Sequence, residues 1–439
     1  MQVLKFGGTS VGKPERMHQV AQLITKDDHS KIVVLSALSG TTNSLVSIAE
    51  SLATASKEEA KAKIEALRAH YYEFILGLLS TEKQRNEAKS IIDEHFEFLL
   101  ITLKISFNEA LNRDILAQGE LMSTKLFTLY LEEIGVQAKL LPALEFMRTN
   151  EEHEPDLELI SEKLMALLEK EKGPSVFITQ GFICKNFKGE IDNLHRGGSD
   201  YTASLVGAAI QASEIQIWTD IDGMHNNDPR VVDKTFPIAE LSFDEAAELA
   251  YFGAKILHPA SIWPAQKMGI TLRLLNTMHP EAKGTVISTA TTSDDVKALA
   301  AKDGITAIKI KSTRMLLAYG FLRKIFEIFE KYKTPIDMIT TSEVAVSVTI
   351  DDDTYLAKIT AELEKFGTVE VDRNQTIICV VGNFVAERKG VVNNIFESLT
   401  SIPIRMISYG GSRHNISLLT DGSYKEEALK KLNKHLFDL

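Results

Sequence analysis

Three short segments of this chain are almost entirely apolar, and they alternate with helical patterns. They are residues 31–36, 175–180 and 215–219. A strand that reads as a nearly continuous apolar run is buried on both faces, which is typical of a mainly parallel sheet covered by helices on each side. The alternation extends from residue 1 to about 50 and from about 135 to 290. It therefore predicts an α/β fold for the first part of the chain.

The beginning of the chain predicts a phosphate-binding loop. KFGGTS, residues 5–10, follows the apolar run of residues 1–4 and precedes a helical pattern in which Pro14 suits the first turn. Paired glycines let backbone N–H groups face an anion without a Cβ in the way, and a helix N-terminus adds partial positive charge. We expect Lys5 to reach from the strand end toward this anion. The alternative is an ordinary tight turn between a strand and a helix.

A second pattern in the same loop is misleading. Residues 7–13 read G-x-x-x-x-G-K, the beginning of a Walker A loop, but the next residue is Pro14. A Walker A loop needs Ser or Thr at that position because the hydroxyl group binds Mg²⁺. This difference excludes a P-loop nucleotide triphosphatase.

Length, charge and cysteine content limit the class of protein. A chain of 439 residues suggests two or three domains, and a net charge of −11 disfavours a nucleic-acid partner. The N-terminus reads as a strand rather than a leader, and no stretch approaches the roughly 20 apolar residues that span a membrane. Cys184 and Cys379 lie far apart, which argues against a disulfide framework and favours a reducing compartment. We expect a cytoplasmic protein.

Two regions differ from the α/β pattern. The first, at about 53–114, has helical spacing over residues 56–77 and 81–112, which predicts a helical hairpin or bundle attached to the α/β body. The second follows the polar segment 289–295 and contains an internal repeat. Residues 320–326 recur at 390–396 and residues 336–342 recur at 404–410, with a spacing of about 70.

Each copy of the repeat reads strand, helix, strand, strand, helix, so we expect two βαββαβ units. We place the catalytic domain at 1–290 and the tandem units at 296–439. The first repeat covers about 312–372, and the second about 373–439 with a strand near 303–311. The alternative is a dimerisation module that binds no ligand.

The motif LHRGGSD, residues 194–200, is the strongest candidate for a substrate site. It follows the strand at 175–180 and opens a helix predicted at 201–212. Arg196 offers bidentate recognition of a carboxylate, and Gly197 and Gly198 permit close approach of the backbone. Ser199 and Asp200 stand at the helix start. The alternative is a turn followed by a helix cap.

Further motifs fall at strand ends or beside glycines, where open α/β sheets bind ligands. They are LSALSGTTN at 35–43, QGE at 118–120, TDIDG at 219–223, DPR at 228–230 and GAKILHP at 253–259. Two of these motifs contain cations, Arg230 and Lys255. Together with Lys5 and Arg196, they give an acidic protein the local positive charge that it needs to bind anions.

Taken in order, these motifs together with ITTSEV at 339–344 resemble those of the aspartate kinases, and the resemblance covers nearly the whole chain. It implies the amino-acid kinase fold, a mainly parallel sheet between helices, followed by two ferredoxin-like ACT domains. The length fits the monofunctional form, without a homoserine dehydrogenase half. The implied reaction is phosphorylation of L-aspartate to 4-phospho-L-aspartate by ATP with Mg²⁺. This is the first step toward lysine, threonine and methionine, with feedback control through the ACT domains.

The resemblance also implies residue roles. The catalytic residues are Lys5 and Asp200. The ATP site contains Lys5, Phe6, Gly7, Gly8, Thr219, Asp220, His225, Arg230 and Lys255. The aspartate site contains Ser36, Thr42, Glu120, Phe182, Arg196, Gly197, Gly198 and Ser199. Two departures are His195, where the family usually has glycine, and His225, where many members have tyrosine.

The first repeat resembles the lysine site of lysine-sensitive aspartate kinases. The matching residues are Met315, Phe321, Leu322, Asp337, Thr341, Ser342 and Glu343. The two acids can take an ammonium group, and backbone groups beside Phe321 can take a carboxylate. The resemblance implies L-lysine as an allosteric inhibitor and a homodimer or higher oligomer formed through the ACT domains. The alternative is that Asp337 and Glu343 merely face water at a strand turn.

The chemistry explains why no catalytic His or Cys motif is expected. A side-chain carboxylate is already ionised at pH 7, so it needs no general base to attack the γ-phosphorus. Mg²⁺ is held largely by phosphates and water, so we expect no metal-ligand cluster in the sequence. Two alternatives remain: another amino-acid kinase, acting on glutamate, acetylglutamate or UMP, or a catalytically inactive amino-acid sensor.

Overall fold

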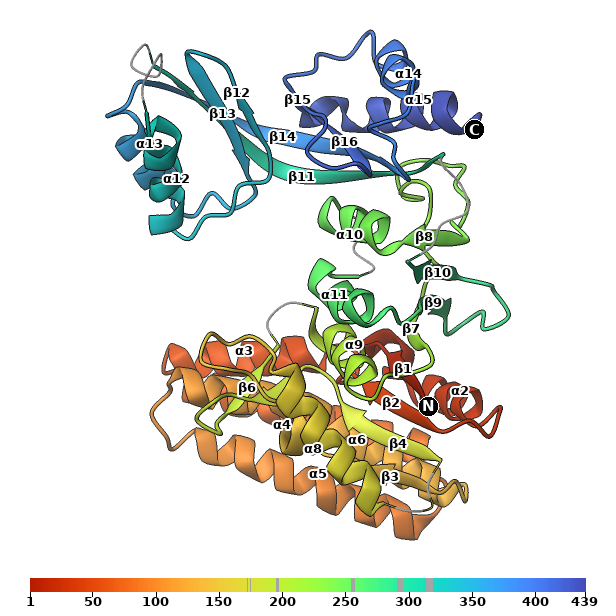
Figure 1. Cartoon of the computed structure of the whole chain (residues 1–439). Helices are drawn as coiled ribbons and strands as arrows, with labels where there is room; N and C mark the ends of the chain where they lie inside the picture. The colour runs from red at the N-terminus through yellow and green to blue at the C-terminus, as the bar shows by residue number, and fades with distance from the viewer. Residues whose placement is uncertain (172, 174, 195–196, 254–256, 290–294, 313–318) are drawn as a thin grey trace. The chain divides into compact units, whose positions relative to one another are not determined.

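The chain forms two compact units (Figure 1). The structure, a computed structural model, describes residues 1–439 except 172, 174, 195–196, 254–256, 290–294 and 313–318. The first unit contains Met1–Met224, Ala239–Phe243 and Leu257–Ala290, and the second contains His225–Ile238, Asp244–Ile256 and Thr291–Leu439. Two segments between residues 225 and 256, which we expected in the catalytic domain, therefore pack with the second unit.

An eight-stranded sheet forms the centre of the first unit. All of its strand pairs are parallel except β9 with β10, which confirms the predicted mainly parallel sheet. The strands predicted at 31–36, 175–180 and 215–219 are β2, β4 and β7. In spatial order the strands are β3 (Ala138–Leu140), β4 (Val176–Gln180), β2 (Lys31–Leu35), β1 (Gln2–Phe6), β7 (Ile215–Thr219), β9 (Leu272–Asn276), β10 (Thr285–Ser288) and β8 (Glu240–Ser242).

The two faces of the central strands bury different helices. Leu4, Phe6, Val33 and Leu35 belong to one apolar cluster with α2 (Pro14–Ile24) and the helices α3 to α6. Alternation along β1 places Lys5 on the opposite face, where α9 (Gly198–Ala209) packs on β1. The other elements of this unit are α1 (Gly8–Val11), α7 (Ala143–Phe146), α8 (Leu157–Lys170), α11 (Pro259–Met268) and the hairpin of β5 (Ile183–Lys185) and β6 (Ile191–Asn193).

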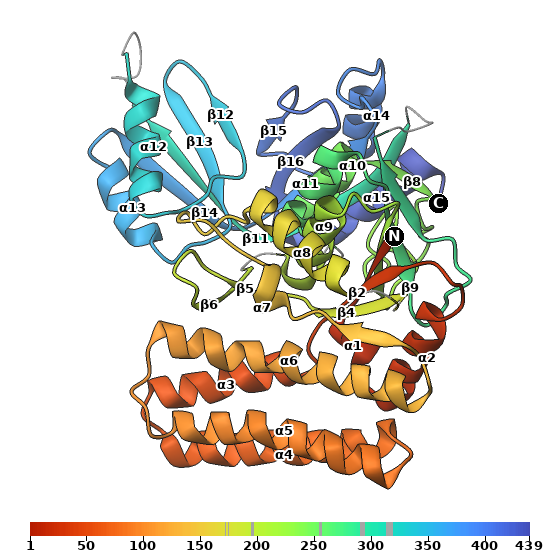
Figure 2. The ribbon, with the colours of Figure 1, turned by 60° about the horizontal axis from the view of Figure 1, so that its bottom comes forward.

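Four helices lie side by side (Figure 2), and they extend beyond the predicted helical region of about 53–114 at both ends. They are α3 (Thr41–Ala53), α4 (Lys57–Leu78), α5 (Glu82–Thr102) and α6 (Glu109–Glu133). The predicted hairpin is α4 with α5. The predicted second helix, 81–112, was too long, because the Asn108 side chain accepts a hydrogen bond from the N–H group of Leu111 and so caps the start of α6.

A six-stranded antiparallel sheet forms the second unit. Its order is β12 (Ile339–Thr341), β13 (Ala345–Ile350), β11 (Val296–Lys311), β14 (Thr368–Gly382), β16 (Asn415–Asp421) and β15 (Met406–Ser408). The long strands β11 and β14 serve both repeats. Residues 306–311 of β11 pair with β13 of the first repeat, so our assignment of a strand near 303–311 to the second repeat was wrong. The reason is that β11 continues through a register shift after Lys302 instead of ending there.

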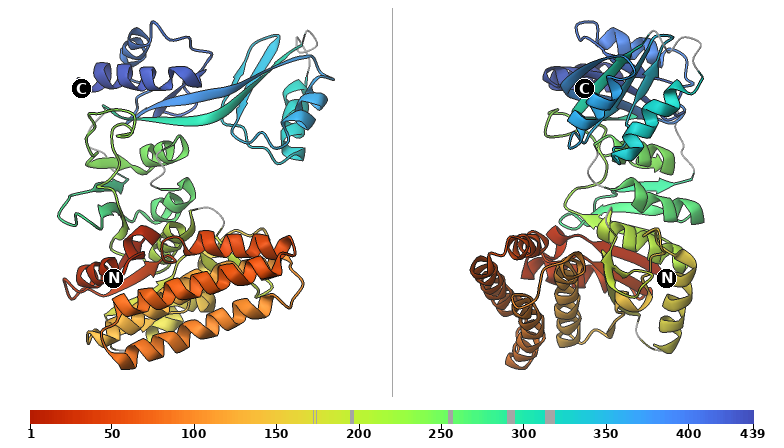
Figure 3. Two further views of the ribbon diagram at one scale, coloured as in Figure 1. Left: turned by 180° about the vertical axis from the view of Figure 1, so that it is seen from behind. Right: turned by 90° about the vertical axis from the view of Figure 1, so that its left-hand side faces the viewer.

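Each repeat has its own apolar core, at opposite ends of β11 and β14 (Figure 3). The first contains α12 (Phe321–Lys331) and α13 (Leu356–Leu363), and the second contains α14 (Val391–Ser398), a short 3₁₀ turn (Gly422–Tyr424) and α15 (Lys425–Phe437). No helix in the described part of the chain combines the length and the apolar character needed to cross a bilayer. Cys184 and Cys379 are buried free thiols.

Candidate active site

Lys5 and Asp200 form a close ion pair at the end of β1. The Lys5 Nζ atom lies 2.6 Å from Asp200 Oδ1, and the two side chains are only 11% and 16% exposed. Asp200 stands in the first turn of α9, on the face of the sheet to which alternation directs Lys5. The two predicted catalytic residues are therefore in contact, and the carboxylate holds the ammonium group at the strand end.

The paired glycines of the loop allow close approach of its neighbours. A Cβ atom on Gly7 would lie 3.3 Å from Lys5 Nζ, and one on Gly8 would lie 3.2 Å from the carbonyl oxygen of Ala37. Because α1 begins at Gly8, its N-terminus adds partial positive charge to that of Lys5. This is the strand, glycine and helix order that the sequence predicted for a phosphate site.

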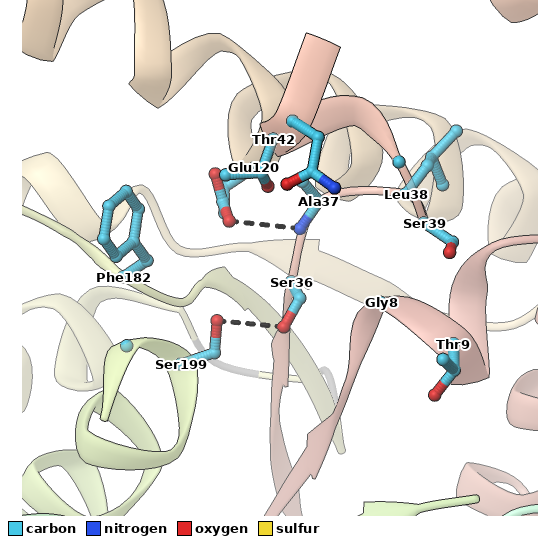
Figure 4. A pocket seen from close by; sticks show the side chains of 13 residues that line it. Gly8, Thr9, Ser36, Ala37, Leu38, Ser39, Thr42, Glu120, Phe182 and Ser199 are labelled. Carbon is cyan, nitrogen blue, oxygen red and sulfur yellow. Dashed lines mark hydrogen bonds between the residues drawn. The ribbon is translucent and has the colours of Figure 1, made fainter. Parts of the chain in front are cut away.

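A cavity of about 430 Å³ lies beside this loop (Figure 4). Six of the eight predicted aspartate-site residues line it, from four separate parts of the chain: Ser36, Thr42, Glu120, Phe182, Gly198 and Ser199. Gly197 is the N-cap of α9, directly before them. Arg196 lies outside the described residues.

Two contacts shape this cavity. Ser36 Oγ donates a hydrogen bond of 2.9 Å to Ser199 Oγ, which joins the end of β2 to the start of α9 (Figure 4). The backbone of Phe182 is left-handed, with φ of 67°, a conformation rarely adopted by non-glycine residues, and its N–H group donates to Thr202 Oγ1. Sequence reasoning missed the preceding Gly181, where a Cβ atom would lie 2.3 Å from Ser199 Cβ.

Glu120 is a buried carboxyl group at the cavity wall. Its Oε1 atom accepts a hydrogen bond of 3.2 Å from the N–H group of Ala37, whereas Oε2 has no hydrogen-bond partner among the described residues (Figure 4). Burial raises the pKa of Glu120 from 4.5 to about 7. A buried carboxyl group with one unused oxygen is suited to a ligand that brings its own ammonium group.

The predicted nucleotide residues fall into three groups. Thr219 ends β7 and Asp220 follows it; because Trp218 of this strand pairs with Phe6 of β1, both residues lie beside the phosphate loop. His225 and Arg230 belong to the second unit. There His225 Nδ1 lies 3.0 Å from Thr235 Oγ1, and the exposed guanidinium of Arg230 donates two hydrogen bonds to Asp228. Lys255 lies outside the described residues.

Six lining residues were missing from the predicted set: Thr9, Ala37, Leu38, Ser39, Gly40 and Asn43. All of them lie within the two motifs at residues 5–10 and 35–43. The signal was therefore present in the sequence, as position within a loop at a strand end rather than as a chemically distinctive side chain.

Comparison with known proteins establishes the family. The sequence model of the amino acid kinase family matches residues 1–276, and an ACT domain model matches residues 378–436. The chain is 37% identical to the lysine-sensitive aspartokinase 3 of Escherichia coli over 99% of both chains. The chain belongs to the aspartokinase family.

Two solved structures of E. coli aspartokinase III support this assignment. The R-state complex with aspartate and ADP matches this aspartokinase with a TM-score of 0.87 at 36% identity over 100% of both chains. The T-state complex with lysine and aspartate matches with a TM-score of 0.80 at 36% identity over 100% of this chain and 99% of that chain. The predicted fold class and the phosphotransferase class are confirmed.

In the regulatory unit of this aspartokinase, Asp337 already has a cationic partner. Lys302 Nζ lies 2.7 Å from Asp337 Oδ1 and 2.8 Å from Asp351 Oδ2, and the Tyr251 hydroxyl donates to Asp337 Oδ1 at 2.9 Å. The Asp337 side chain is 1% exposed. The alternative in which this acid faces water was therefore wrong, although it holds for the exposed Glu343.

The other predicted regulatory residues lie around the same repeat. Phe321 packs edge-on against Phe366 in the core of the repeat, and Leu322 beside it is 38% exposed. Thr341 ends β12, and the N–H group of Ser342 donates to the carbonyl of Ala345 in the following turn. Met315 lies outside the described residues.

Proposed function

We propose that this aspartokinase transfers the γ-phosphoryl group of ATP to the side-chain carboxylate of L-aspartate, forming 4-phospho-L-aspartate. The observation that carries the proposal is the Lys5–Asp200 pair at the end of β1, beside the cavity that contains Glu120. A cation at the strand end is suited to the phosphates, and a buried carboxyl group is suited to the amino group of the acceptor. The phosphate loop and the acceptor cavity therefore adjoin within the first unit.

Each of the three charged groups of the acceptor is assigned a place in the site. We assign its ammonium group to the unused oxygen of Glu120 and its reacting end to the region of Ser36 and Ser199, whose hydroxyl groups already contact each other. Arg196, which adjoins Gly197 in sequence, is assigned the α-carboxylate because a guanidinium binds a carboxylate in a bidentate manner.

The transfer step needs position and charge rather than a base. The acceptor carboxylate is ionised, so the site has to place it in line with the γ-phosphorus and neutralise charge on the transferring group. Lys5 supplies that charge, and Asp200 orients Lys5. The resemblance of the sequence motifs assigns Arg230 and Lys255 to the nucleotide as well.

Mg²⁺ is proposed to accompany ATP. No group of three or more His, Cys, Asp or Glu side chains among the described residues is arranged to hold a metal ion. The proposal therefore gives Mg²⁺ phosphate oxygens and water as its main ligands, which this ion favours in phosphoryl-transfer sites. The cationic side chains of the protein then neutralise the phosphate charge that Mg²⁺ does not neutralise.

An acceptor panel tests this function against its alternatives. ATP turnover is measured with aspartate, glutamate, acetylglutamate and UMP under identical conditions. We expect turnover with aspartate alone. Turnover only with another acceptor would make the protein a different amino-acid kinase, and binding of an amino acid without turnover would make it an inactive sensor.

We also propose that L-lysine inhibits the enzyme by binding in the first repeat, at Asp337 and Glu343. Because Lys302 occupies Asp337 in this structure, the ammonium group of the ligand has to replace that of Lys302. The same exchange releases Tyr251, the last residue of α10 (Phe243–Tyr251), from Asp337.

The helix α10 is held close to the residues of this exchange. Its residues bind the regulatory sheet at two further points, through Glu245 with Lys297 and Glu248 with Asn415. Just after it, a Cβ atom on Gly253 would lie 2.2 Å from the carbonyl oxygen of Ala301, the neighbour of Lys302. Lys255 follows in sequence. An effector that binds one arrangement of α10 more tightly will therefore favour that arrangement.

The second repeat carries the same ion pair with its charges exchanged. About 70 positions after Lys302 stands Asp372, and at the position equivalent to Asp337 stands Arg405. These two side chains form an ion pair. A ligand ammonium group thus finds no acid at this position of the second repeat, which supports the assignment of the lysine site to the first repeat alone.

We further propose a cytoplasmic homodimer or higher oligomer formed through the regulatory sheet. The edge strand β12 has an exposed Ile339, and Val344 in the turn after it is 50% exposed. An exposed strand edge with apolar side chains is suited to pairing with a second copy. Sedimentation equilibrium tests this proposal: we expect a dimer or a larger species, and a monomer at all concentrations would contradict it.

A further inference from the structure

Tyr71 connects the helical insertion to the first residue of α3. It lies on α4, its side chain is completely buried, and its hydroxyl oxygen is 3.2 Å from Thr41 Oγ1. Its ring packs edge-on against Phe96 of α5, with 5.9 Å between the ring centres. Because this hydroxyl pair lies in an apolar cluster, where a lost partner is not replaced by bulk water, it constrains Thr41 strongly.

Thr41 lies directly behind the aspartate cavity. The residues on both sides of it line that cavity: Ser39 and Gly40 before it, and Thr42 and Asn43 after it. Thr41 itself is 1% exposed and does not line the cavity. A change in the position of Thr41 therefore moves a continuous part of the cavity wall.

The helix α6 holds Thr41 from another side. A Cβ atom on Gly119 would lie 3.3 Å from Thr41 Cγ2 and 2.8 Å from Ala37 Cβ, so the helix packs directly on this loop. The next residue, Glu120, accepts the hydrogen bond from Ala37. Burial raises the pKa of the Tyr71 phenol, and the charge of Glu120 raises it further. The hydroxyl group therefore stays protonated.

We propose that Tyr71 is a positioning residue for the aspartate site, acting through Thr41 on the cavity wall formed by residues 39–43. Tyr71 does not line the cavity; it sets the place of the residues that do. The insertion thereby takes part in substrate binding in addition to stabilising the fold. This inference rests on the proposed aspartate kinase activity.

Steady-state kinetics of Tyr71→Phe test the proposal, because this change removes only the hydroxyl oxygen. We expect the KM for aspartate to rise about tenfold, with kcat and the KM for ATP changed by less than about twofold. The matched control is Tyr72→Phe on the same helix. Its hydroxyl bonds with Asp93 and Arg68 instead, and we expect an unchanged KM for aspartate.

Two further variants separate positioning from general loosening. Thr41→Ser keeps the hydroxyl group and should stay close to wild type, whereas Thr41→Val should raise the KM for aspartate as Tyr71→Phe does. Tyr71→Phe and Thr41→Val remove the same hydrogen bond, so the double variant Tyr71→Phe/Thr41→Val should have a KM for aspartate no higher than that of either single variant. Additive effects in the double variant would contradict the proposal, as would parallel rises in the KM values for aspartate and ATP. Wild-type aspartate turnover is measured in the same series, so an unchanged KM in Tyr71→Phe refutes the positioning role while the kinase assignment stands.

Discussion

At the scale of single residues, the carboxyl group of Glu120 links substrate binding to pH. Its pKa of about 7, raised by burial, means that much of the free protein is protonated at this group near neutral pH. The ammonium group of aspartate would supply the missing counter-charge and favour the ionised form. Binding of aspartate below pH 7 is therefore coupled to release of a proton.

We expect kcat/KM for aspartate to fall about tenfold per pH unit below about pH 7 and to level off above it, because this quantity reports groups of the free enzyme. Glu120→Gln cannot ionise, so it should lower kcat/KM and remove the inflection. Since the ATP phosphates titrate in the same range, the comparison with Glu120→Gln is the deciding one. An inflection that survives in this variant would assign the titration to another group.

The same shift in pKa affects stability. The folded protein binds a proton at Glu120 more tightly than the unfolded chain, whose pKa is near 4.5. The contribution of Glu120 protonation to the stability of the folded protein is therefore complete below pH 4.5 and is lost as the pH rises through about 7. In urea denaturation without substrate, Glu120→Gln should gain stability relative to wild type between about pH 5 and about pH 8. If the free energies of unfolding of Glu120→Gln and wild type differed by the same amount at both pH values, Glu120 would not be a buried carboxyl group with a raised pKa.

Lys5 and Asp200 are expected to act on the rate of transfer rather than on folding. Lys5→Ala and Asp200→Ala should each lower kcat by a factor on the order of 10²–10³ and leave the circular dichroism spectrum unchanged. The matched control is Lys13→Ala, which removes an exposed lysine from the rejected Walker A pattern in the same loop and should retain turnover. Near-normal turnover in folded Lys5→Ala would refute its role, and a collapse in Lys13→Ala would reopen the P-loop interpretation.

At the scale of elements, α10 and β11 meet at Asp337, the proposed lysine-binding acid, because Tyr251 of α10 and Lys302 of β11 both bind it. If Lys302 competes with the ligand for Asp337, the two residues have opposite effects on inhibition. Lys302→Met should lower the lysine concentration needed for half-inhibition, whereas Asp337→Asn should raise it at least about tenfold, with basal activity retained in both. Lys331→Met, which removes an exposed lysine of α12, serves as the control.

Isothermal calorimetry on the same variants checks binding independently of turnover. Weaker lysine binding in Lys302→Met would make Lys302 part of the binding site rather than a competitor. Binding of threonine instead of lysine to wild type would overturn the regulatory assignment while leaving the kinase assignment intact.

The elements also show where sequence reasoning succeeds and where it stops. The apolar runs of β2 and β4 could be recognised because both strands are buried on both faces, and that of β7 because three of its five residues are buried. The end of the helix predicted at 81–112 was not, because Asn108 acts as a cap only in the context of the following helix. The course of β11 was also missed, since a strand that continues through a register shift looks in sequence like two strands.

At the scale of the whole molecule, long-range contacts bring residues from separate local motifs together around one cavity. Six of the eight residues predicted for the aspartate site line one cavity, and all of these except Phe182 lie in the motifs at 35–43, 118–120 and 194–200. The environment of Asp337 was not predictable in this way, because its partners Lys302 and Tyr251 lie 35 and 86 positions away and carry no motif. The division into units was missed for a related reason: α10 lies within the kinase sequence but packs on the regulatory sheet.

The central claim is that an acyl phosphate forms on the side chain of L-aspartate. Hydroxylamine converts an acyl phosphate into a hydroxamate, which gives a coloured ferric complex and a product that can be identified by mass. With ATP, Mg²⁺ and L-aspartate, the account predicts aspartate β-hydroxamate in wild type and its near absence in Lys5→Ala. No hydroxamate with aspartate, together with a clear signal with glutamate or another acid, would contradict the account.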